Sequence, residues 1–99
     1  MSETETRIER ETGTARGHYV YRAEGVEAVL TYRVLAPGRI VADHTGVPDA
    51  FRGQGIALKL VQRLVADARA EGVKIVPACS YVAAQARRHP DWGDVFTAA

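Results

Sequence analysis

Hydrophobic and polar positions alternate through the first half of the chain, as in β-strands that bury one face. Three segments are rich in β-branched and aromatic residues: 17–22, 26–34 and 39–47. Turn-forming residues separate them at 23–25 and at Pro37-Gly38, so the pattern predicts a meander of antiparallel strands. A shorter first strand is expected at 7–10, after a polar segment, 1–6, that we expect to be frayed.

The second half of the chain changes to a period of three and four residues. From residue 54 to residue 70 apolar side chains recur at this spacing with polar side chains opposite them, which predicts an amphipathic helix packed on the sheet. Gly72 is well placed as its left-handed terminator, and residues 73–76 indicate another strand, parallel to the one before the helix. Together these elements would form a βαβ unit.

A second helix is predicted to begin with Ser80, whose hydroxyl suits a capping position, and to stop before Pro90. Three apolar residues follow and are expected to pack back over the core: Trp92, Val95 and Phe96. The sequence therefore predicts an α/β (α+β) fold, with a mostly antiparallel sheet, a central βαβ unit and two main helices.

Composition limits the classes of function. The chain has 99 residues, of which 46% are hydrophobic and 25% charged, and this is typical of one soluble domain spanning residues 1–99. The formal net charge of +1 argues against a dedicated nucleic-acid-binding protein. No apolar run approaches the roughly 18 residues of a membrane span, and the N-terminus is polar rather than signal-like. We expect a cytoplasmic protein with no membrane partner.

Cysteine and histidine usage argues against metal chemistry. The single cysteine, Cys79, excludes an internal disulfide and a thiolate zinc cluster. The three histidines, His18, His44 and His89, lack the spacing of metal ligands. No bound metal is expected.

The most informative segment is the loop before the first predicted helix, Arg52-Gly53-Gln54-Gly55-Ile56-Ala57. Its glycines allow a tight turn, and the unpaired N–H groups at the start of the helix suit phosphate oxygens. The loop lacks the Gly-Lys-Ser/Thr ending of a P-loop and the third glycine of the dinucleotide fingerprint. On these residues alone, an anion-binding site and an ordinary surface turn both remain open.

A ligand held at this loop would extend along the carboxyl ends of the two parallel strands. Cys79 follows one of these strands, next to a helix N-terminus that lowers a thiol pKa, so it is either an acyl acceptor or a small buried hydrophobe. His44 on the other strand is either a general base or a half-buried structural histidine that shares its face with Ile40 and Ala42. Tyr81 either donates a hydrogen bond to the thiolate or packs in the core.

These residues together resemble the GCN5-related N-acetyltransferases, and in particular the small YjdJ-type branch of that family. The resemblance covers roughly residues 17–92 and is carried by segments 43–48 and 52–57, by Val76-Pro77-Ala78-Cys79-Ser80-Tyr81-Val82-Ala83 and by Arg88-His89-Pro90. The family's loop pattern is Arg or Gln, two residues, Gly, one residue, then Gly or Ala. Its backbone amides hold the pyrophosphate of coenzyme A.

The resemblance implies a minimal N-acetyltransferase fold that transfers acetyl from acetyl-CoA to an amine of a small molecule or a protein. It implies a cosubstrate site made of Val47, Arg52, Gly53, Gln54, Gly55, Ile56, Ala57, Ser80 and Tyr81. Cys79 stands where a cysteine of this branch has been regarded as an acetyl acceptor. The protein is expected to be a monomer or a homodimer.

Two departures from the family pattern affect the usual acid and base. The branch often has glutamate where this chain has Gly46, and the general-acid tyrosine of larger relatives falls near Arg88. Cys79 and His44 are therefore the expected catalytic residues, and direct attack by the amine stays open. Two alternatives also remain: a coenzyme A or acyl-CoA binding module without catalysis, and an interaction domain whose glycine loop is only a turn.

Overall fold

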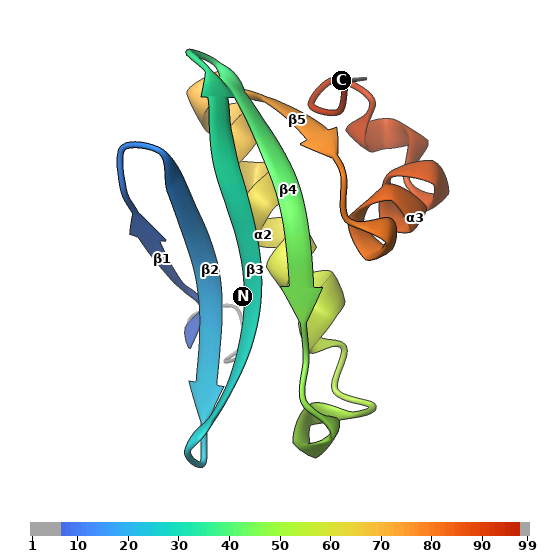
Figure 1. Cartoon of the computed structure of the whole chain (residues 1–99). Helices are drawn as coiled ribbons and strands as arrows, with labels where there is room; N and C mark the ends of the chain where they lie inside the picture. The colour runs from blue at the N-terminus through green and yellow to red at the C-terminus, as the bar shows by residue number, and fades with distance from the viewer. Residues whose placement is uncertain (1–6, 98–99) are drawn as a thin grey trace.

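The computed structural model describes residues 7–97, so the expectation for residues 1–6 lies outside the described part of the chain. Five strands form one sheet in chain order, and all neighbours are antiparallel except β4 and β5 (Figure 1). The elements are β1 (Glu9–Thr12), β2 (Arg16–Ala23), β3 (Val26–Ala36), β4 (Arg39–Gly46), the 3-10 turn η1 (Asp49–Phe51), α2 (Ile56–Glu71), β5 (Lys74–Pro77), α3 (Ser80–Arg88) and the 3-10 turn η2 (Pro90–Trp92). The predicted fold class is confirmed, although the βαβ unit lies at one side of the described sheet rather than at its centre.

The predicted hairpin is formed by β2 and β3. Its two-residue turn has positive φ at both positions, 54° at Glu24 and 76° at Gly25, which matches the twist of the flanking strands. The first strand pairs from Glu9 to Thr12, two residues later than the expected 7–10, and Ile8 instead buries its side chain in the core.

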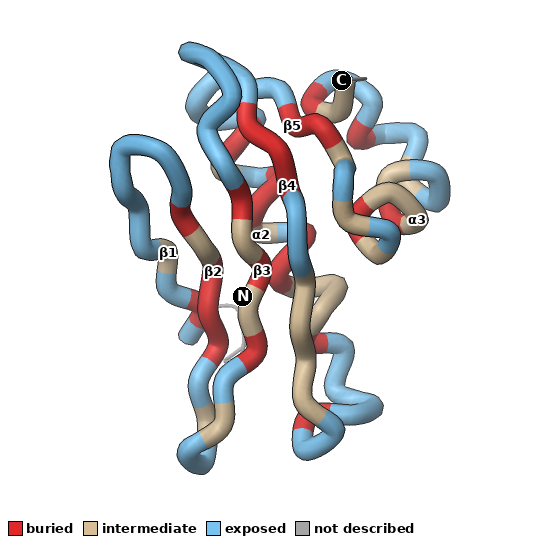
Figure 2. The backbone as a smooth tube through the Cα atoms, in the orientation of Figure 1, coloured by how far each residue is buried: buried red, intermediate tan, exposed pale blue. Residues whose placement is uncertain are grey.

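The helix α2 packs on one face of the sheet and buries the apolar positions that its period predicts. They are Ile56, Leu60, Val61, Leu64, Val65 and Ala68. The helix ends at Gly72, which is left-handed with φ 70° as predicted, and whose N–H donates to the Ala68 carbonyl. Figure 1 shows α2 behind the strands, and Figure 2 shows buried residues along the middle strands and on α2. Among the described residues, no helix is both long and apolar enough to cross a membrane.

The segment after β5 closes the outer side of the sheet. Helix α3 starts at Ser80 itself, and its capping position is occupied by Cys79, so the expected Ser80 cap is wrong. Beyond η2, the Ile75 N–H donates to the Val95 carbonyl at 2.7 Å, and the Thr97 N–H donates to the Ile75 carbonyl at 2.9 Å. Of the three residues expected to cover the core, two are buried and one is partly buried: Trp92, Val95 and Phe96.

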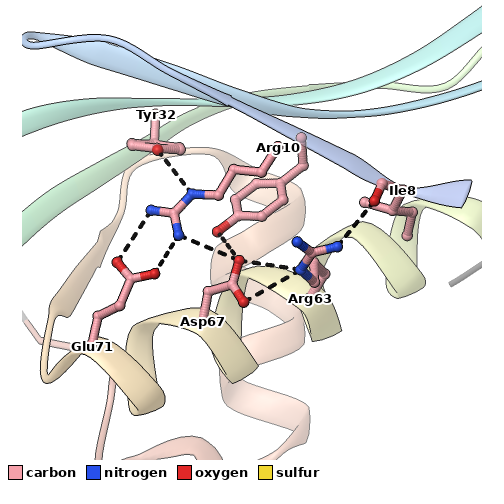
Figure 3. A network of polar contacts seen from close by, with 7 residues as sticks. Ile8, Arg10, Tyr32, Arg63, Asp67 and Glu71 are labelled. Carbon is pink, nitrogen blue, oxygen red and sulfur yellow. Dashed lines mark hydrogen bonds and ion pairs between the residues drawn. The ribbon is translucent and has the colours of Figure 1, made fainter. Parts of the chain in front are cut away.

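A polar network joins β1 and β2 to α2 (Figure 3). The Tyr19 hydroxyl donates to Asp67 at 2.9 Å, and Arg63 binds Asp67 at 3.2 Å. Arg10 forms an ion pair with Glu71 and also reaches Asp67 at 3.4 Å. The pKa of the Tyr19 hydroxyl is raised above the ordinary range. Burial of the side chain is the larger cause, and the hydrogen bond to Asp67 is the next.

A β-bulge interrupts the pairing of β3 with β4 and changes the expected position of His44. Thr31 pairs with His44, but the next residue, Tyr32, pairs with Ala42, so Asp43 is the extra residue of the bulge. Ala42 is buried in the core, whereas His44 is exposed. The expectation that His44 shares the buried face with Ala42 is therefore wrong, because the bulge shifts the alternation of side chains by one residue.

Candidate active site

The glycine loop joins the end of β4 to α2 and adopts a conformation that requires glycine. Gly53 has φ 81° and Gly55 has φ 69°, both in the left-handed region that favours glycine. A Cβ at either position would meet nothing within 4 Å. The backbone conformation therefore selects these glycines, and the surface outside the loop is open to a ligand.

One buried aromatic residue anchors the loop to the sheet. Phe51, in η1, is 4% exposed and packs edge-on against Tyr21, with ring centroids 5.2 Å apart. The next residue, Arg52, points outward, with its side chain 80% exposed and only a surface ion pair with Asp49 at 3.1 Å. The loop is thus fixed on one side, and its basic side chain remains available on the other.

Four backbone N–H groups at the start of α2 have no acceptor among residues 7–97. From Gly55 onward, the first N–H group with a described backbone acceptor is that of Lys59, which donates to the Gly55 carbonyl at 3.1 Å. The N–H groups before it, from Gly55 to Leu58, make no described hydrogen bond, and no side chain caps the helix. This is the usual state of a helix N-terminus and a favourable place for anionic oxygens.

The parallel strands separate beside this loop. Pairing between β4 and β5 ends where Ala42 meets Pro77. The N–H groups of Ala78 and Cys79 both donate to the Ala42 carbonyl, at 3.1 and 2.8 Å, and the chain then turns away into α3. Residues 43–46 of β4 therefore continue without a partner strand on that side, which leaves backbone groups for an extended ligand (Figure 1).

Cys79 lies at this separation, and its thiol contacts β4. Its Sγ is 3.4 Å from the Thr45 Oγ1. Burial of Cys79 opposes ionisation, but hydrogen bonds from the Thr45 hydroxyl and from the N–H groups of Val82, Tyr81 and Thr45 outweigh it. The net effect lowers the pKa of the thiol below its ordinary value, so the thiolate is more populated at neutral pH than in a free cysteine.

The other predicted site residues take different positions. His44 lies on the exposed side of β4 near Gly46, where an added Cβ would be 3.1 Å from the His44 Nε2. The Thr45 side chain between them contacts Cys79, so alternation separates His44 from the thiol. The Tyr81 hydroxyl interacts with the Gln85 side chain rather than with Cys79.

Two further predicted contacts flank the separated strands. Val47, directly after β4, is half-buried, and Ser80, the first residue of α3, is exposed. Sequence reasoning did not find Thr45 as the partner of the thiol. Its only signal is the polar run Asp43-His44-Thr45 within an otherwise apolar strand. No group of three potential metal ligands occurs within residues 7–97.

Comparison with known proteins shows which class of protein has this sequence and fold. Residues 18–95 match the family described as GCN5-related N-acetyl-transferase. A curated relative, Protein NATD1 of Xenopus tropicalis, is 35% identical over 63 residues, which is 64% of this chain and 58% of the relative. Protein NATD1 of Gallus gallus is 31% identical over 85 residues, which is 84% of this chain and 77% of the relative. The first alignment thus spans less than two thirds of its relative.

A solved structure supports the same class. The solution structure of a GCN5-like candidate N-acetyltransferase from Staphylococcus aureus superimposes with a TM-score of 0.69 at 29% identity, over 95% of this chain and 92% of that chain. The sheet and its two helices therefore form the small α/β fold of an acetyltransferase. The chain belongs to the GCN5-related N-acetyltransferase family, whose members ordinarily use acetyl-CoA as cosubstrate.

Proposed function

We propose that this protein transfers acetyl from acetyl-CoA to an amine. The observation that carries the proposal is the run of N–H groups from Gly55 to Leu58, which have no acceptor among the described residues and follow the unpartnered part of β4 in the chain. The amides would bind the pyrophosphate, and the backbone around Val47 would pair with the pantetheine arm. This arrangement directs the thioester toward Cys79 and Thr45.

In the direct mechanism, His44 accepts a proton from the acceptor ammonium, and the free amine attacks the thioester carbonyl carbon. The carbon–nitrogen bond forms as the carbon–sulfur bond breaks, the nitrogen releases its second proton to solvent, and the coenzyme A thiolate takes up a proton in return. An exposed imidazole is accessible to an incoming ammonium, and histidine is the side chain that most often acts as a general base. Cys79 in this mechanism only lines the pocket.

In the covalent mechanism, the Cys79 thiolate attacks the thioester carbonyl and releases the coenzyme A thiolate. The amine then attacks the acetyl-cysteine, forms the amide and regenerates the Cys79 thiolate. The lowered pKa of the thiol favours this route. The proton released by the amine passes to solvent.

Calorimetric titration with acetyl-CoA tests the binding step. We expect saturable binding, accompanied by amide chemical-shift changes from Gly53 to Leu58. The absence of binding at millimolar ligand would leave the interaction domain, whose loop is only a turn, as the better description. Binding without thiol release across a panel of amines would instead favour a coenzyme A binding module without catalysis.

Intact-protein mass spectrometry after incubation with acetyl-CoA separates the two mechanisms. The covalent mechanism gives an acetyl adduct that disappears on Cys79→Ser and on addition of an amine. Turnover by the Cys79→Ser variant, without an adduct in the unmodified protein, would assign the direct mechanism. The cytoplasmic location and the monomeric or homodimeric state stay predictions.

A further inference from the structure

The face of the sheet opposite α2 carries a groove that the proposed chemistry does not use. It has a volume of about 400 Å³ and crosses four strands from β1 to β4. The charged and polar side chains in its lining include Glu11, Arg16, His18, Thr31, Arg33 and Asp43. Figure 1 shows this face toward the viewer, with α2 behind the sheet and α3 at the right, beyond β5.

Two arginines stand directly opposite each other in this groove. Arg16 of β2 pairs in register with Arg33 of β3, and like charges in such a pair repel. Arg33 is partly compensated by Asp43, at 3.3 Å. Arg16 forms no ion pair with any residue from 7 to 97, although it lies in a hydrogen-bonded turn where the Gly13 N–H donates to its carbonyl at 2.8 Å.

The carboxylates of the groove are already engaged by other groups. Asp43 accepts a hydrogen bond from the Thr31 hydroxyl at 2.5 Å in addition to its contact with Arg33. Glu11 lies 2.8 Å from the His18 Nε2. The uncompensated charge in the groove is therefore the guanidinium of Arg16, and the groove has the chemistry of an anion site.

The groove ends next to the proposed base in sequence, because Asp43 is the residue of β4 that lines it. Asp43 is the bulge residue of β4, and His44, the proposed base, is the next residue and is exposed. Two strand spacings, about 10 Å, separate β2 from β4. A ligand whose anionic end contacts Arg16 and Arg33 thus spans several carbon atoms before it reaches His44.

We propose that this groove binds the carboxylate of the acceptor, so that the substrate is a small amine with a carboxylate several carbons from the reacting nitrogen. The guanidinium fork of Arg16 matches a carboxylate in shape and charge. The inference rests on the proposed acetyl transfer, which requires the amine end of the substrate to point toward His44. It depends on Arg16 and Arg33 alone for the recognition of the anion.

The test compares three amines with the same four-methylene chain: 5-aminopentanoate, pentylamine and 4-aminobutylphosphonate. With thiol release as the readout, we expect 5-aminopentanoate to have a KM about tenfold below that of pentylamine, the effect of one charge-assisted hydrogen bond. Arg16→Gln should move the ratio of the two KM values toward one. Equal KM values in the unmodified protein, or an unchanged ratio in the variant, would overturn the proposal, and a preference for the phosphonate would overturn the choice of carboxylate.

Arg39→Gln is the matched control, because Arg39 is an exposed arginine of β4 that lies outside the groove lining. Arg39→Gln should leave the KM ratio unchanged. If both variants changed the ratio equally, the cause would be the overall charge of the protein rather than the groove, and the proposal would be contradicted. Arg16→Gln should not lower the unfolding free energy, since it removes a like-charge contact; a lower value would assign Arg16 a structural role.

A binding measurement separates this inference from the proposed function. If no amine is turned over, titration of the protein with 5-aminopentanoate should still shift the amide resonances of Thr31 and Arg33, and Arg16→Gln should abolish these shifts. Shifts without turnover would reject the transferase proposal and retain the anion site. The absence of shifts would reject the anion site whatever the activity.

Discussion

The Sγ of Cys79 lies 3.4 Å from the Oγ1 of Thr45, so the first turn of α3 and the unpartnered part of β4 meet through one polar contact. This contact joins residues 34 positions apart in the chain. It holds the thiol where the two parallel strands separate, which is the place toward which the proposed function directs the thioester.

We predict that Thr45→Val raises the pKa of the Cys79 thiol. The substitution keeps the side-chain volume but removes the hydroxyl that stabilises the thiolate. The pH dependence of alkylation by iodoacetamide measures this pKa, and its midpoint should move upward. Ser80→Ala is the control, because no hydrogen bond between the Ser80 hydroxyl and the thiol is described. An unchanged midpoint in Thr45→Val would mean that the backbone amides alone set the pKa.

Gly55→Ala should weaken acetyl-CoA binding, and the loss of affinity should be larger than the loss of folding stability can explain. Gly55 and Gly72 flank α2 with nearly equal φ, 69° and 70°, so alanine at either position costs about 1 kcal/mol of backbone strain. Chemical denaturation should show similar losses for Gly55→Ala and Gly72→Ala. Calorimetry should show weaker binding only for Gly55→Ala, and parallel losses of affinity would contradict a specific role of the loop.

Tyr19 should make the protein sensitive to alkaline pH. Burial, and then the hydrogen bond to Asp67, raises the pKa of Tyr19 above its unfolded value near 10. The stabilisation is therefore fully present below about pH 10 and is lost above it, by about 1.4 kcal/mol per pH unit, because only the unfolded chain releases the proton. Tyr19→Phe should be less stable at pH 7 and should have a flatter decline above pH 10. A decline of equal slope would exclude Tyr19 as its source.

A carboxylate at position 46 should replace the function of His44. Under the direct mechanism, His44→Ala lowers kcat/KM at pH 7 by about a hundredfold, the scale of a lost general base. Gly46→Glu in that background should restore part of the activity, since the three atoms nearest to an added Cβ belong to the His44 imidazole, which is then absent. Steady-state rates over a pH series check this. Full activity of His44→Ala would show that solvent removes the proton.

Local patterns predicted most of the elements. The three- and four-residue period of α2 and the two-residue turn at Glu24-Gly25 depend on neighbours in sequence, and both appear where they were expected. Pairing of β5 with β4 follows from the same patterns, because a helix between two strands favours a parallel crossover.

The site details depended on contacts that local patterns do not contain. The bulge at Asp43 is set by the register of β4 against β3, and it reversed the expected face of His44. The hydroxyl of Ser80 met the usual criterion for a helix cap, but the chain enters α3 one residue earlier, at Cys79. The contact of Cys79 with Thr45 exists only because β4 and β5 separate after Ala42.

The bridge between Ile75 and Phe96 has a consequence for how the molecule behaves in concentrated solution. Residues 95–97 take up hydrogen-bonding positions that β5 would otherwise offer to a strand of a neighbouring molecule. Removal of these residues should therefore favour edge-to-edge association between molecules, so that the first effect is turbidity of the solution rather than a lower melting temperature.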